Sequence, residues 1–384
     1  MKFKTYAMED VLEEILDYRG KTPKKSEVGI PTLSAKSVKN NHIDYSLCYY
    51  ISPDEYKRFM VRGFPKVGDV LLTTEAPMGQ VARLDRNDVG IAQRLLTLRG
   101  KQGVLDNEYL LYFLQSSIGQ SLLKARETGT TVTGIKQVEF RKIQIDIPEI
   151  TAQRKIGSFL RILDQKIELN NKINENLEKQ AKAIFRHMFI DNINSNCKKG
   201  TLSDIADITM GQSPNGSSYN NDGNGTIFFQ GRAEFGFRFP SVRLYTTEPK
   251  RMAYLNDILM SVRAPVGDIN VAHDDCCIGR GLAAIHSKSN HQSFVLYTMF
   301  FLKKQLDIFN SEGTVFGSIN RNSLNDMPIL IPQNELLDEF EKIVAPMDLA
   351  IRNNSDEIFR LQNIRDILLP RLMSGEIDVS EIEF

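Results

Sequence analysis

The sequence predicts an α+β protein in which two similar globular domains are joined by two long antiparallel helices. Its halves repeat each other, each half ends in a long heptad pattern, and the composition is 41% hydrophobic and 25% charged, as in a soluble globular protein. A chain of 384 residues is long enough for two domains with separate cores. We expect globular domains at 1–149 and 191–332, a central helix at 150–190 and a C-terminal helix at 333–384. The expected shape is a coiled-coil dumbbell with internal pseudo-twofold symmetry.

The repeat is visible in two pairs of segments. "GTTVTGIKQVEFRKIQIDIP" at 129–148 returns in the second half of the chain as "GTVFGSINRNSLNDMPILIP" at 313–332. "GDVLLTTEAPMGQ" at 68–80 returns at nearly the same offset as "NDILMSVRAPVGD" at 256–268. An amphipathic stretch precedes each GT segment and a long helical pattern follows each Ile-Pro. A duplicated half explains this order.

The long helical segments carry one heptad seam twice, at spacings of three and four residues. A helix of about 40 residues runs roughly 60 Å. Asn170 and Asn354 hold equivalent seam positions, where a polar side chain fixes register at some cost in stability. The seam residues that we expect to pair the helices are Ile156, Leu160, Leu163, Ile167, Asn170, Leu177, Ile184, Phe340, Val344, Met347, Ile351, Asn354, Leu361 and Leu368.

The zero net charge conceals two segments of opposite sign. Residues 150–199 carry ten basic and five acidic side chains, net +5, whereas residues 333–384 carry five and twelve, net −7. Opposite charge favours pairing of the two helices with each other over pairing of either helix with itself.

The globular segments mix short β-type runs with Gly, Pro and Asn punctuation, which indicates α+β domains with irregular loops. The polar stretch "SPNGSSYNNDGNG" at 213–225 is expected to form a surface loop that does not pack.

Catalytic patterns are scarce in this chain. The "RGKTPKK" segment at 19–25 lacks the first glycine of a phosphate-binding loop, and we interpret it as a basic turn. Four cysteines without CxxC spacing and five scattered histidines indicate free thiols, no metal site and a cytoplasmic protein. The charged start of the sequence predicts no signal peptide, and no apolar run is long enough to span a membrane.

Polar and basic loop residues at matched positions are the remaining candidates for function. Thr133 and Ser318 are candidate N-caps of short helices, whose free N–H groups would suit a phosphate; an equally good interpretation is that the GT loops only reverse the chain. Arg and Gln suit bidentate contacts with guanine and adenine, although any single one is more often a solvated surface residue. The candidates for DNA contact are Lys36, Arg58, Arg62, Thr74, Gln93, Arg94, Thr130, Thr131, Thr133, Lys136, Gln230, Arg232, Arg238, Arg243, Arg263, Arg280, Thr314, Ser318, Asn320 and Arg321.

The GT segments ending in Ile-Pro, followed by "AQRKIGSFLRILDQKIELNNKINENLEKQAKAIFRHMF", resemble the specificity subunits of type I restriction–modification systems. The closing "LQNIRDILLPRLMSGEI" is similar to the last conserved helix of that family, so the resemblance spans the chain.

The resemblance implies a non-catalytic subunit in which each globular domain, a target-recognition domain, recognises one half of a bipartite site in double-stranded DNA. The helices would set the spacer and dock two modification subunits, which use S-adenosylmethionine to methylate adenine. Restriction subunits would add ATP- and Mg-dependent translocation and cleavage, so no cofactor is expected on this chain. The near-neutral second domain fits poorly with phosphate contacts, and we therefore expect weak DNA binding by the isolated chain.

Two alternatives stay open from the residues. A helical-hairpin scaffold whose end domains bind proteins would explain the coil and the neutral charge, but not the diverged polar loops of the two domains. A self-sufficient methyltransferase or nuclease is disfavoured by the missing motifs.

Overall fold

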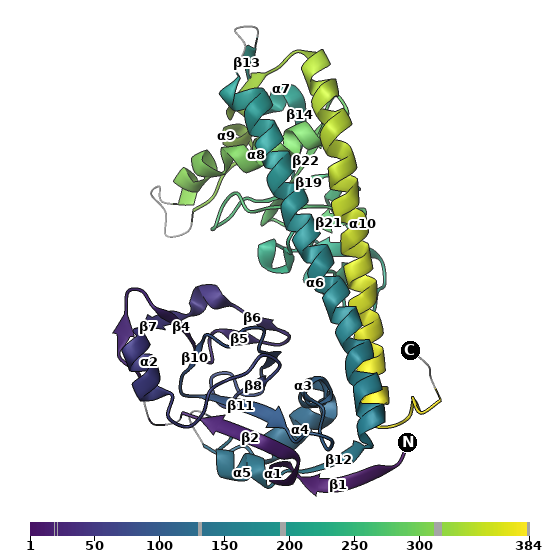
Figure 1. Ribbon diagram of the computed structural model, residues 1–384. Coiled ribbons are helices and arrows are strands. Elements are labelled where there is room, and N and C mark those ends of the chain that lie inside the picture. The colour runs from purple at the N-terminus through teal and green to yellow at the C-terminus, as the bar shows by residue number, and fades with distance from the viewer. Residues whose placement is uncertain (19, 21, 130–132, 193–196, 311–316, 382–384) are drawn as a thin grey trace. The chain divides into compact units, whose positions relative to one another are not determined.

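The computed structural model describes residues 1–18, 20, 22–129, 133–192, 197–310 and 317–381. These residues form two compact units: unit 1 is Met1–Asn170 with Glu357–Phe384, and unit 2 is Asn171–Asp356. Each unit contains one globular domain and a part of both long helices (Figure 1).

Unit 1 is built on an antiparallel four-stranded sheet in the order β2-β11-β8-β9. A second sheet, in the order β10-β4-β7-β3, contains one parallel pair, β10 with β4. The strands of the two sheets are β2 (Leu12–Asp17), β11 (Leu95–Gly100), β8 (Val70–Thr73), β9 (Val81–Arg83), β10 (Gly90–Ile91), β4 (Ile30–Leu33), β7 (Tyr49–Ile51) and β3 (Lys25–Ser26).

Smaller elements complete the first domain. The remaining strands are β1 (Phe3–Ala7), which pairs antiparallel with β12 (Gln144–Pro148), and the short pair β5 (Val38–Lys39) and β6 (His42–Ile43). The helices are α1 (Met8–Val11), α2 (Pro53–Phe59), α3 (Asn107–Gln115), α4 (Ser117–Ala125), α5 (Gln137–Arg141) and the 3₁₀ turn η1 (Tyr45–Leu47). Local signals explain two starts: Ser52 caps α2, with Pro53 in its first turn, and the Asp106 carboxylate accepts from the first N–H groups of α3.

Unit 2 repeats the first sheet strand for strand, in the order β14-β22-β19-β20. Its second sheet, β15-β17-β16-β21-β18, again contains one parallel pair, β16 with β21. The strands are β14 (Ala206–Met210), β22 (Leu282–Ser287), β19 (Ile258–Ser261), β20 (Ile269–Val271), β15 (Tyr219–Asn220), β17 (Tyr245–Thr246), β16 (Thr226–Phe229), β21 (Cys276–Ile278) and β18 (Met252–Ala253). The predicted duplication is confirmed at the level of strand order.

The rest of unit 2 also follows the first. Strand β13 (Lys198–Thr201) pairs with β23 (Pro328–Ile331), as β1 pairs with β12. The helices are α7 (Leu202–Ile205), α8 (Gln292–Leu306), α9 (Arg321–Asn325) and the 3₁₀ turns η3 (Gly216–Ser218), η4 (Arg232–Glu234) and η5 (Asp307–Asn310).

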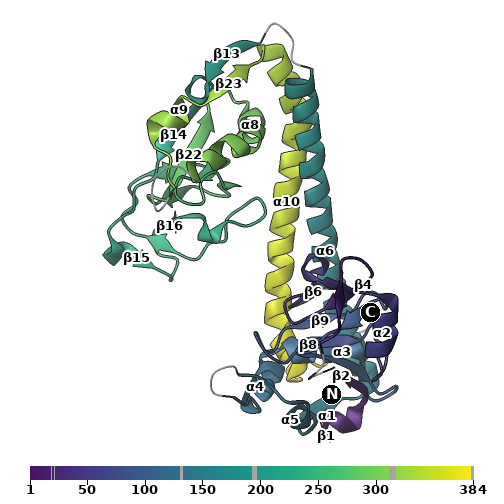
Figure 2. The ribbon, with the colours of Figure 1, turned by 90° about the vertical axis from the view of Figure 1, so that its left-hand side faces the viewer.

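The two long helices are α6 (Ile150–Arg186), which ends in a π-helical turn at His187–Asp191, and α10 (Asn334–Met373). Each follows directly after the Ile-Pro strand of its half. In unit 1, Arg365 contacts Asp164 while Glu357, which precedes Arg365 on α10, contacts Asn170, so the helices run antiparallel. In unit 2, Phe340 packs on Phe185 and Asn354 bonds to Asn174, in the same sense. The helices lie side by side within each unit (Figures 1 and 2).

The residues of the predicted seam are buried or half-buried. Seven of its residues are buried: Ile156, Leu160, Ile167, Asn170, Phe340, Val344 and Ile351. The other seven are half-buried: Leu163, Leu177, Ile184, Met347, Asn354, Leu361 and Leu368. Several members, such as Ile156 and Leu160, also belong to the core of the adjoining globular domain. A two-sided contact of this kind explains why the helices hold the domains as well as each other.

The prediction that residues 213–225 would not pack is wrong. Ser218 is buried, and its hydroxyl lies 2.7 Å from the Thr246 hydroxyl. The Tyr219 ring lies 4.9 Å from the Phe228 ring, and β15 extends the second sheet at its edge. Cross-strand partners distant in sequence therefore order a segment whose composition alone indicates a free loop.

All four cysteines are free thiols, and burial raises the pKa of the Cys276 thiol to about 12. Within the described part of the chain, no helix combines the length and the apolar character that a membrane crossing requires. Among the same residues, no group of three His, Cys, Asp or Glu side chains could hold a metal ion.

Candidate nucleic-acid interface

Three segments that the sequence marks as candidates meet at one place in the first domain. The Thr74 N–H donates to the Arg94 carbonyl at 3.0 Å, and the Ile135 N–H donates to the Thr74 carbonyl at 3.0 Å. Glu75 also pairs with Gly134 in an isolated β-bridge. We call residues 74–80, 93–94 and 133–136 loop cluster 1.

The same backbone pattern recurs in the second domain. The Val262 N–H donates to the Gly281 carbonyl at 2.9 Å, and the Ile319 N–H donates to the Val262 carbonyl at 3.1 Å. Arg263 bridges to Ser318, as Glu75 does to Gly134. Residues 262–268, 280–281 and 317–321 therefore form loop cluster 2, and the two clusters share one backbone frame.

Each cluster contains a turn with the sequence Ala-Pro-x-Gly that a hydroxyl holds together. The Thr73 hydroxyl donates to the Pro77 carbonyl at 2.7 Å and accepts from the Gln80 N–H at 2.9 Å. Ser261 makes the same two bonds, to Pro265 and from Asp268, at 2.7 and 2.9 Å.

The glycine of each turn is required twice over. Gly79 and Gly267 have φ of +89° and +84°, in the left-handed region that favours glycine. A Cβ at Gly79 would lie 2.6 Å from the Gln120 side-chain oxygen, and one at Gly267 would lie 2.8 Å from the Leu306 Cβ. The turns are thus packed closely on α4 and on the end of α8.

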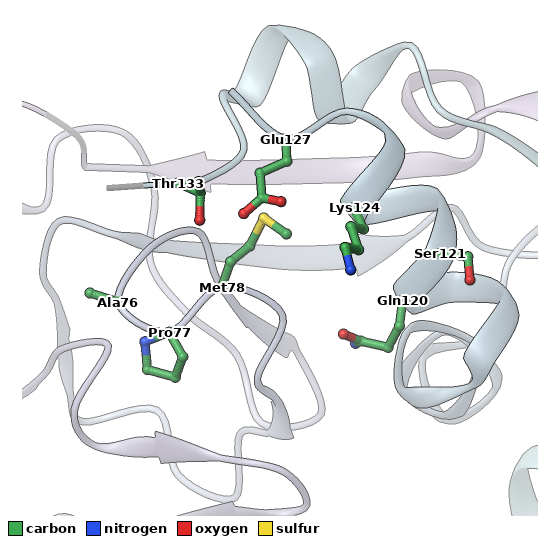
Figure 3. A pocket seen from close by; sticks show the side chains of 8 residues that line it. All are labelled: Ala76, Pro77, Met78, Gln120, Ser121, Lys124, Glu127 and Thr133. Carbon is green, nitrogen blue, oxygen red and sulfur yellow. The ribbon is translucent and has the colours of Figure 1, made fainter. Parts of the chain in front are cut away.

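A cavity of about 580 Å³ lies between the first turn and α4. Figure 3 shows its lining: Pro77 and Met78 come from the turn, Lys124 and Gln120 from α4, and Glu127 and Thr133 from the GT loop region. The Gln120 amide donates to the Gly79 carbonyl at 2.9 Å, which ties α4 to the turn. The cavity carries one basic and one acidic side chain, so its charge alone favours no ion.

The polar side chains of the two clusters differ although their frames agree. In loop cluster 1 the Arg94 guanidinium, about half exposed, lies 3.2 Å from the Glu75 carboxylate. In loop cluster 2 the position of Glu75 is taken by Arg263, which is exposed, and Arg280 is exposed beside it. Asp268 of the second turn pairs with Arg232 and, at 3.4 Å, with Lys303. Two scaffolds of one geometry thus present different arrays of donors and acceptors.

The N-cap predictions for Thr133 and Ser318 are wrong. Helix α5 has Lys136 as its N-cap residue, without a side-chain bond, and α9 has Asn320, whose side chain accepts from the Ser323 N–H at 2.9 Å. The preceding residues are extended because they bridge to the Ala-Pro-x-Gly turns. Both helices are five residues long, so the phosphate site expected at their N-termini has no support.

The other candidates lie on several elements of the two domains. Lys36 follows β4, and Gln230 and Arg232 follow β16; all three are exposed, and a Cβ at Gly281 would meet the Gln230 carbonyl at 2.9 Å. Gln93, Lys136 and Arg321 belong to the clusters themselves. Arg58 and Arg62 lie on and just after α2, bonded to Glu55 and to the Asp17 carbonyl, and Arg243 pairs with Glu234 at 3.1 Å. Thr130, Thr131 and Thr314 lie outside the described residues.

Two candidates are buried and cannot present a free group at this surface. Thr74 is 2% exposed and contributes through its backbone. Arg238 is 3% exposed, and its guanidinium lies 2.8 Å from Asp348 and 3.2 Å from Glu178. We therefore correct the assignment of Arg238: it holds the fold together and leaves the set of DNA contacts.

The sequence analysis missed two matched tyrosine–aspartate pairs, in which both tyrosines and Asp164 are buried and Asp348 is half-buried. Tyr112 donates to Asp164 at 2.7 Å in unit 1, and Tyr297 donates to Asp348 at 2.9 Å in unit 2. Burial, and then the neighbouring aspartate, raise the pKa of both tyrosines, so the phenols stay protonated donors at neutral pH. The repeat itself is the signal that could have found them, because both the tyrosines and the aspartates hold matched positions in the two halves.

Comparison with known proteins fits this duplicated arrangement. The family model of the type I restriction modification DNA specificity domain matches residues 2–179 and, a second time, residues 194–355. The chain belongs to this family.

Individual members agree along nearly the whole length. A Methanocaldococcus jannaschii protein named for the specificity subunit of type I restriction enzyme MjaX is 29% identical, over 97% of this chain and 93% of that protein. The specificity subunit of type I restriction enzyme HindI from Haemophilus influenzae is 22% identical, over 81% and 87%. The crystal structure of the type I restriction–modification S subunit from M. genitalium has 17% identity and a TM-score of 0.64, over 97% of this chain and 96% of that one. That structure shows that the fold is shared.

Proposed function

We propose that this chain is the DNA sequence-specificity subunit of a type I restriction–modification complex, and that each loop cluster reads one half of a bipartite duplex site. The observation that carries the proposal is the pair of clusters with one backbone frame and different polar side chains. Arg, Gln and Asn in such positions can contact base edges in the major groove, where each base pair presents its own pattern of donors and acceptors. A duplicated reader with diverged side chains then reads two different half-sites.

In this proposal the chain divides into four functional parts. Residues 1–149 and 191–332 are the two target-recognition domains, and residues 150–190 and 333–384 contain the long helices α6 and α10, which set the spacer between the half-sites. Long helices suit this role because their rise per residue is fixed.

The helices also carry the docking surface that we assign to two modification subunits. Large apolar side chains are exposed on both helices, where monomeric proteins rarely gather such residues. In unit 1 they are Ile162, Leu169, Phe359, Ile364 and Ile367, and in unit 2 they are Ile173, Ile343 and Leu349. Methyl transfer to adenine, with S-adenosylmethionine, and cleavage, with ATP and Mg, belong in this proposal to the modification and restriction subunits. The chain itself acts without catalysis, on double-stranded DNA in the cytoplasm.

Selection from a random duplex library tests the proposal. The chain is assembled with its modification subunit, and bound DNA is amplified and sequenced over several rounds. We expect two short conserved blocks separated by a spacer of fixed length and free sequence. A single continuous block would contradict the division between two clusters. The absence of any enrichment by a well-assembled complex would favour the protein-binding scaffold instead.

A further inference from the structure

The two units pair an equivalent aspartate, buried in unit 1 and half-buried in unit 2, with arginines from different parts of the fold. Asp164 on α6 and Asp348 on α10 hold the same position in the two copies of the repeat. In unit 1, Asp164 accepts from Arg365 of α10 at 2.9 Å. In unit 2, Asp348 accepts from Arg238 at 2.8 Å. Arg238 is not a helix residue; it lies in the segment after η4, inside the second recognition domain.

The repeat shows which residue of α6 is equivalent to the arginine of α10. In the repeat, Ala181 of α6 is equivalent to Arg365 of α10, and Ala181 is completely buried. Alanine carries no charge, and in unit 2 the guanidinium of Arg238 pairs with Asp348 instead. The same guanidinium lies 3.2 Å from Glu178 on α6 and 3.4 Å from the Tyr297 hydroxyl on α8. One side chain of the recognition domain thereby contacts both long helices.

Several hydrogen bonds and one cation–π contact hold the segment that carries Arg238. The Ser241 N–H donates to the Glu234 carbonyl at 2.8 Å, and Gly236 exchanges two hydrogen bonds with the Asn270 side chain, at 3.2 and 2.9 Å. Phe239 lies beneath the Arg352 guanidinium of α10, 5.0 Å from its ring centre. Two side chains of residues 232–241 are exposed. Arg232 pairs with Asp268 of loop cluster 2, and Phe237 is 49% exposed. Arg238, which contacts both helices, is thus next to Phe237 and close to Arg232 along the chain.

The counterpart in the first domain has a different attachment. The β5–β6 segment is held by the Asn41 N–H, which donates to the Val81 carbonyl at 3.0 Å, and by the Val81 N–H, which donates to the Asn40 side chain at 3.1 Å. The Gln115 amide of α3 also donates to the Val81 carbonyl at 3.2 Å. These neutral bonds remain within the globular domain, whereas the charged bonds of Arg238 join the domain to the helices.

We propose that Arg238 is a positioning residue for the second half-site: it fixes residues 232–241 against the two helices and so places Arg232 and Phe237 for contact with DNA. The inference rests on the proposed function, in which the second domain reads one half-site. The Arg238 guanidinium is buried between two carboxylates. Its loss leaves Asp348 with the Tyr297 hydroxyl and Glu178 with Lys182, and removes the ion pairs that join the segment to both helices. Recognition of one half-site should then relax, while the other half-site keeps its frame.

The test compares Arg238→Gln with Arg365→Gln, which removes the matched arginine of unit 1. Each chain is expressed with its modification subunit in a host without other adenine methylation, and the methylated motif is determined by single-molecule sequencing. For Arg238→Gln we expect methylation at single-base variants of one half-site to rise about tenfold relative to the native site, the scale of one lost base contact. The other half-site should stay unchanged, and Arg365→Gln should leave both half-sites unchanged.

A charge transplant separates positioning from simple stabilisation. The double variant Arg238→Ala with Ala181→Arg returns an arginine to Asp348 from the helix, as in unit 1. We expect it to regain the thermal stability lost in Arg238→Gln, but to keep the relaxed half-site, because the segment still lacks its ion pairs to the two helices. A sharp native motif from a folded Arg238→Gln or from the transplant would overturn the proposal, as would equal relaxation of both half-sites. A native chain that yields no bipartite motif would instead count against the proposed function.

Discussion

At the scale of single residues, buried charges decide how the recognition domains are attached. Asp164 is 3% exposed, and its two oxygens accept from Tyr112 and from Arg365, which belong to different elements. Burial alone would lower the pKa of the Arg365 guanidinium, but Asp164 outweighs it, so the pKa is raised and the pair stays ionised. A buried pair contributes little when it is intact, yet losing one partner is strongly destabilising.

Replacing Arg365 tests this account of unit 1. Arg365→Gln should lower the free energy of unfolding by about 3 kcal/mol, because it leaves the Asp164 carboxylate buried with Tyr112 alone. Urea denaturation followed by circular dichroism measures the loss. The exposed Arg360 on the same helix provides the control: Arg360→Gln should change stability by less than about 0.5 kcal/mol. Equal effects of the two substitutions would contradict the assignment.

Arg94 tests loop cluster 1. Its guanidinium is about half exposed and lies beside Glu75, at the point where the three segments meet. Arg94→Ala should relax the first half-site at about one base pair, roughly a tenfold loss of discrimination, and leave the second half-site intact. The methylated motif of the assembled complex gives the readout. Arg86 is a matched control, since it is another exposed arginine paired with a carboxylate, Asp88, but lies outside the cluster. Arg86→Ala should preserve the methylated motif. A change as large as that of Arg94→Ala would argue against a role of the cluster in recognition.

At the scale of elements, the helix seam contains asparagines that favour one register. Asn354 donates to Asn174 at 2.9 Å in unit 2, and Asn170 donates to Glu357 at 2.7 Å in unit 1. Asn170 and Asn354 hold equivalent positions in the repeat, yet each bonds to a different type of partner. Such polar contacts specify pairing at some cost in stability.

Leucine substitutions at Asn174 and Asn354 test whether these polar contacts lower the stability of the chain. Asn354→Leu alone should destabilise the chain by about 1 kcal/mol, because Asn174 loses a hydrogen-bond partner in a buried site. The double variant Asn174→Leu with Asn354→Leu should be at least as stable as the native chain, since both polar groups are replaced. Thermal unfolding of the three proteins measures the difference. A double variant less stable than the single one would show that the pair is stabilising in itself.

The helices and the strand before each of them could be predicted from sequence, because both depend on local periodicity. The 3,4 spacing from Ile156 onward and the Ile-Pro strand ends are short-range patterns. The start of α5 could not be predicted in the same way. Gly134 is held extended by bridges to Glu75 and Thr128, and the first of these is a long-range contact that delays the helix to Gln137.

The same limit applies to the site. Arg263, in loop cluster 2, is exposed, whereas Arg238 is buried against two helices. No local pattern distinguishes them, because the burial of Arg238 depends on the alanine at 181 and the aspartate at 348. Comparison of the two halves would have pointed to this site, since the arginine of one half has no counterpart on the helix of the other.

At the scale of the whole molecule, charge limits what the chain can do alone. Its net charge is zero, and residues 333–384 carry a net charge of −7. Contacts with DNA phosphates require surplus Lys and Arg, and they supply most of the sequence-independent affinity. We therefore assign much of the backbone contact to the modification subunits of the complex.

Binding of the isolated chain to duplex DNA should accordingly be weak. We expect a dissociation constant of about 10⁻⁶ M or weaker at physiological salt, and binding at least about 100-fold tighter after assembly with the modification subunit. Fluorescence anisotropy with a labelled duplex, over a range of salt concentrations, measures both. Nanomolar, salt-resistant binding by the chain alone would contradict this division of contacts.

In the proposed function, one chain reads two half-sites through two copies of one domain. The most direct measurement is single-molecule sequencing of DNA from cells that express the modification subunit with the chain, compared with cells that lack the chain. We expect a bipartite N6-methyladenine motif that disappears when the chain is absent. A motif that persists without the chain, or no methylation when both proteins are verified to be present, would contradict it.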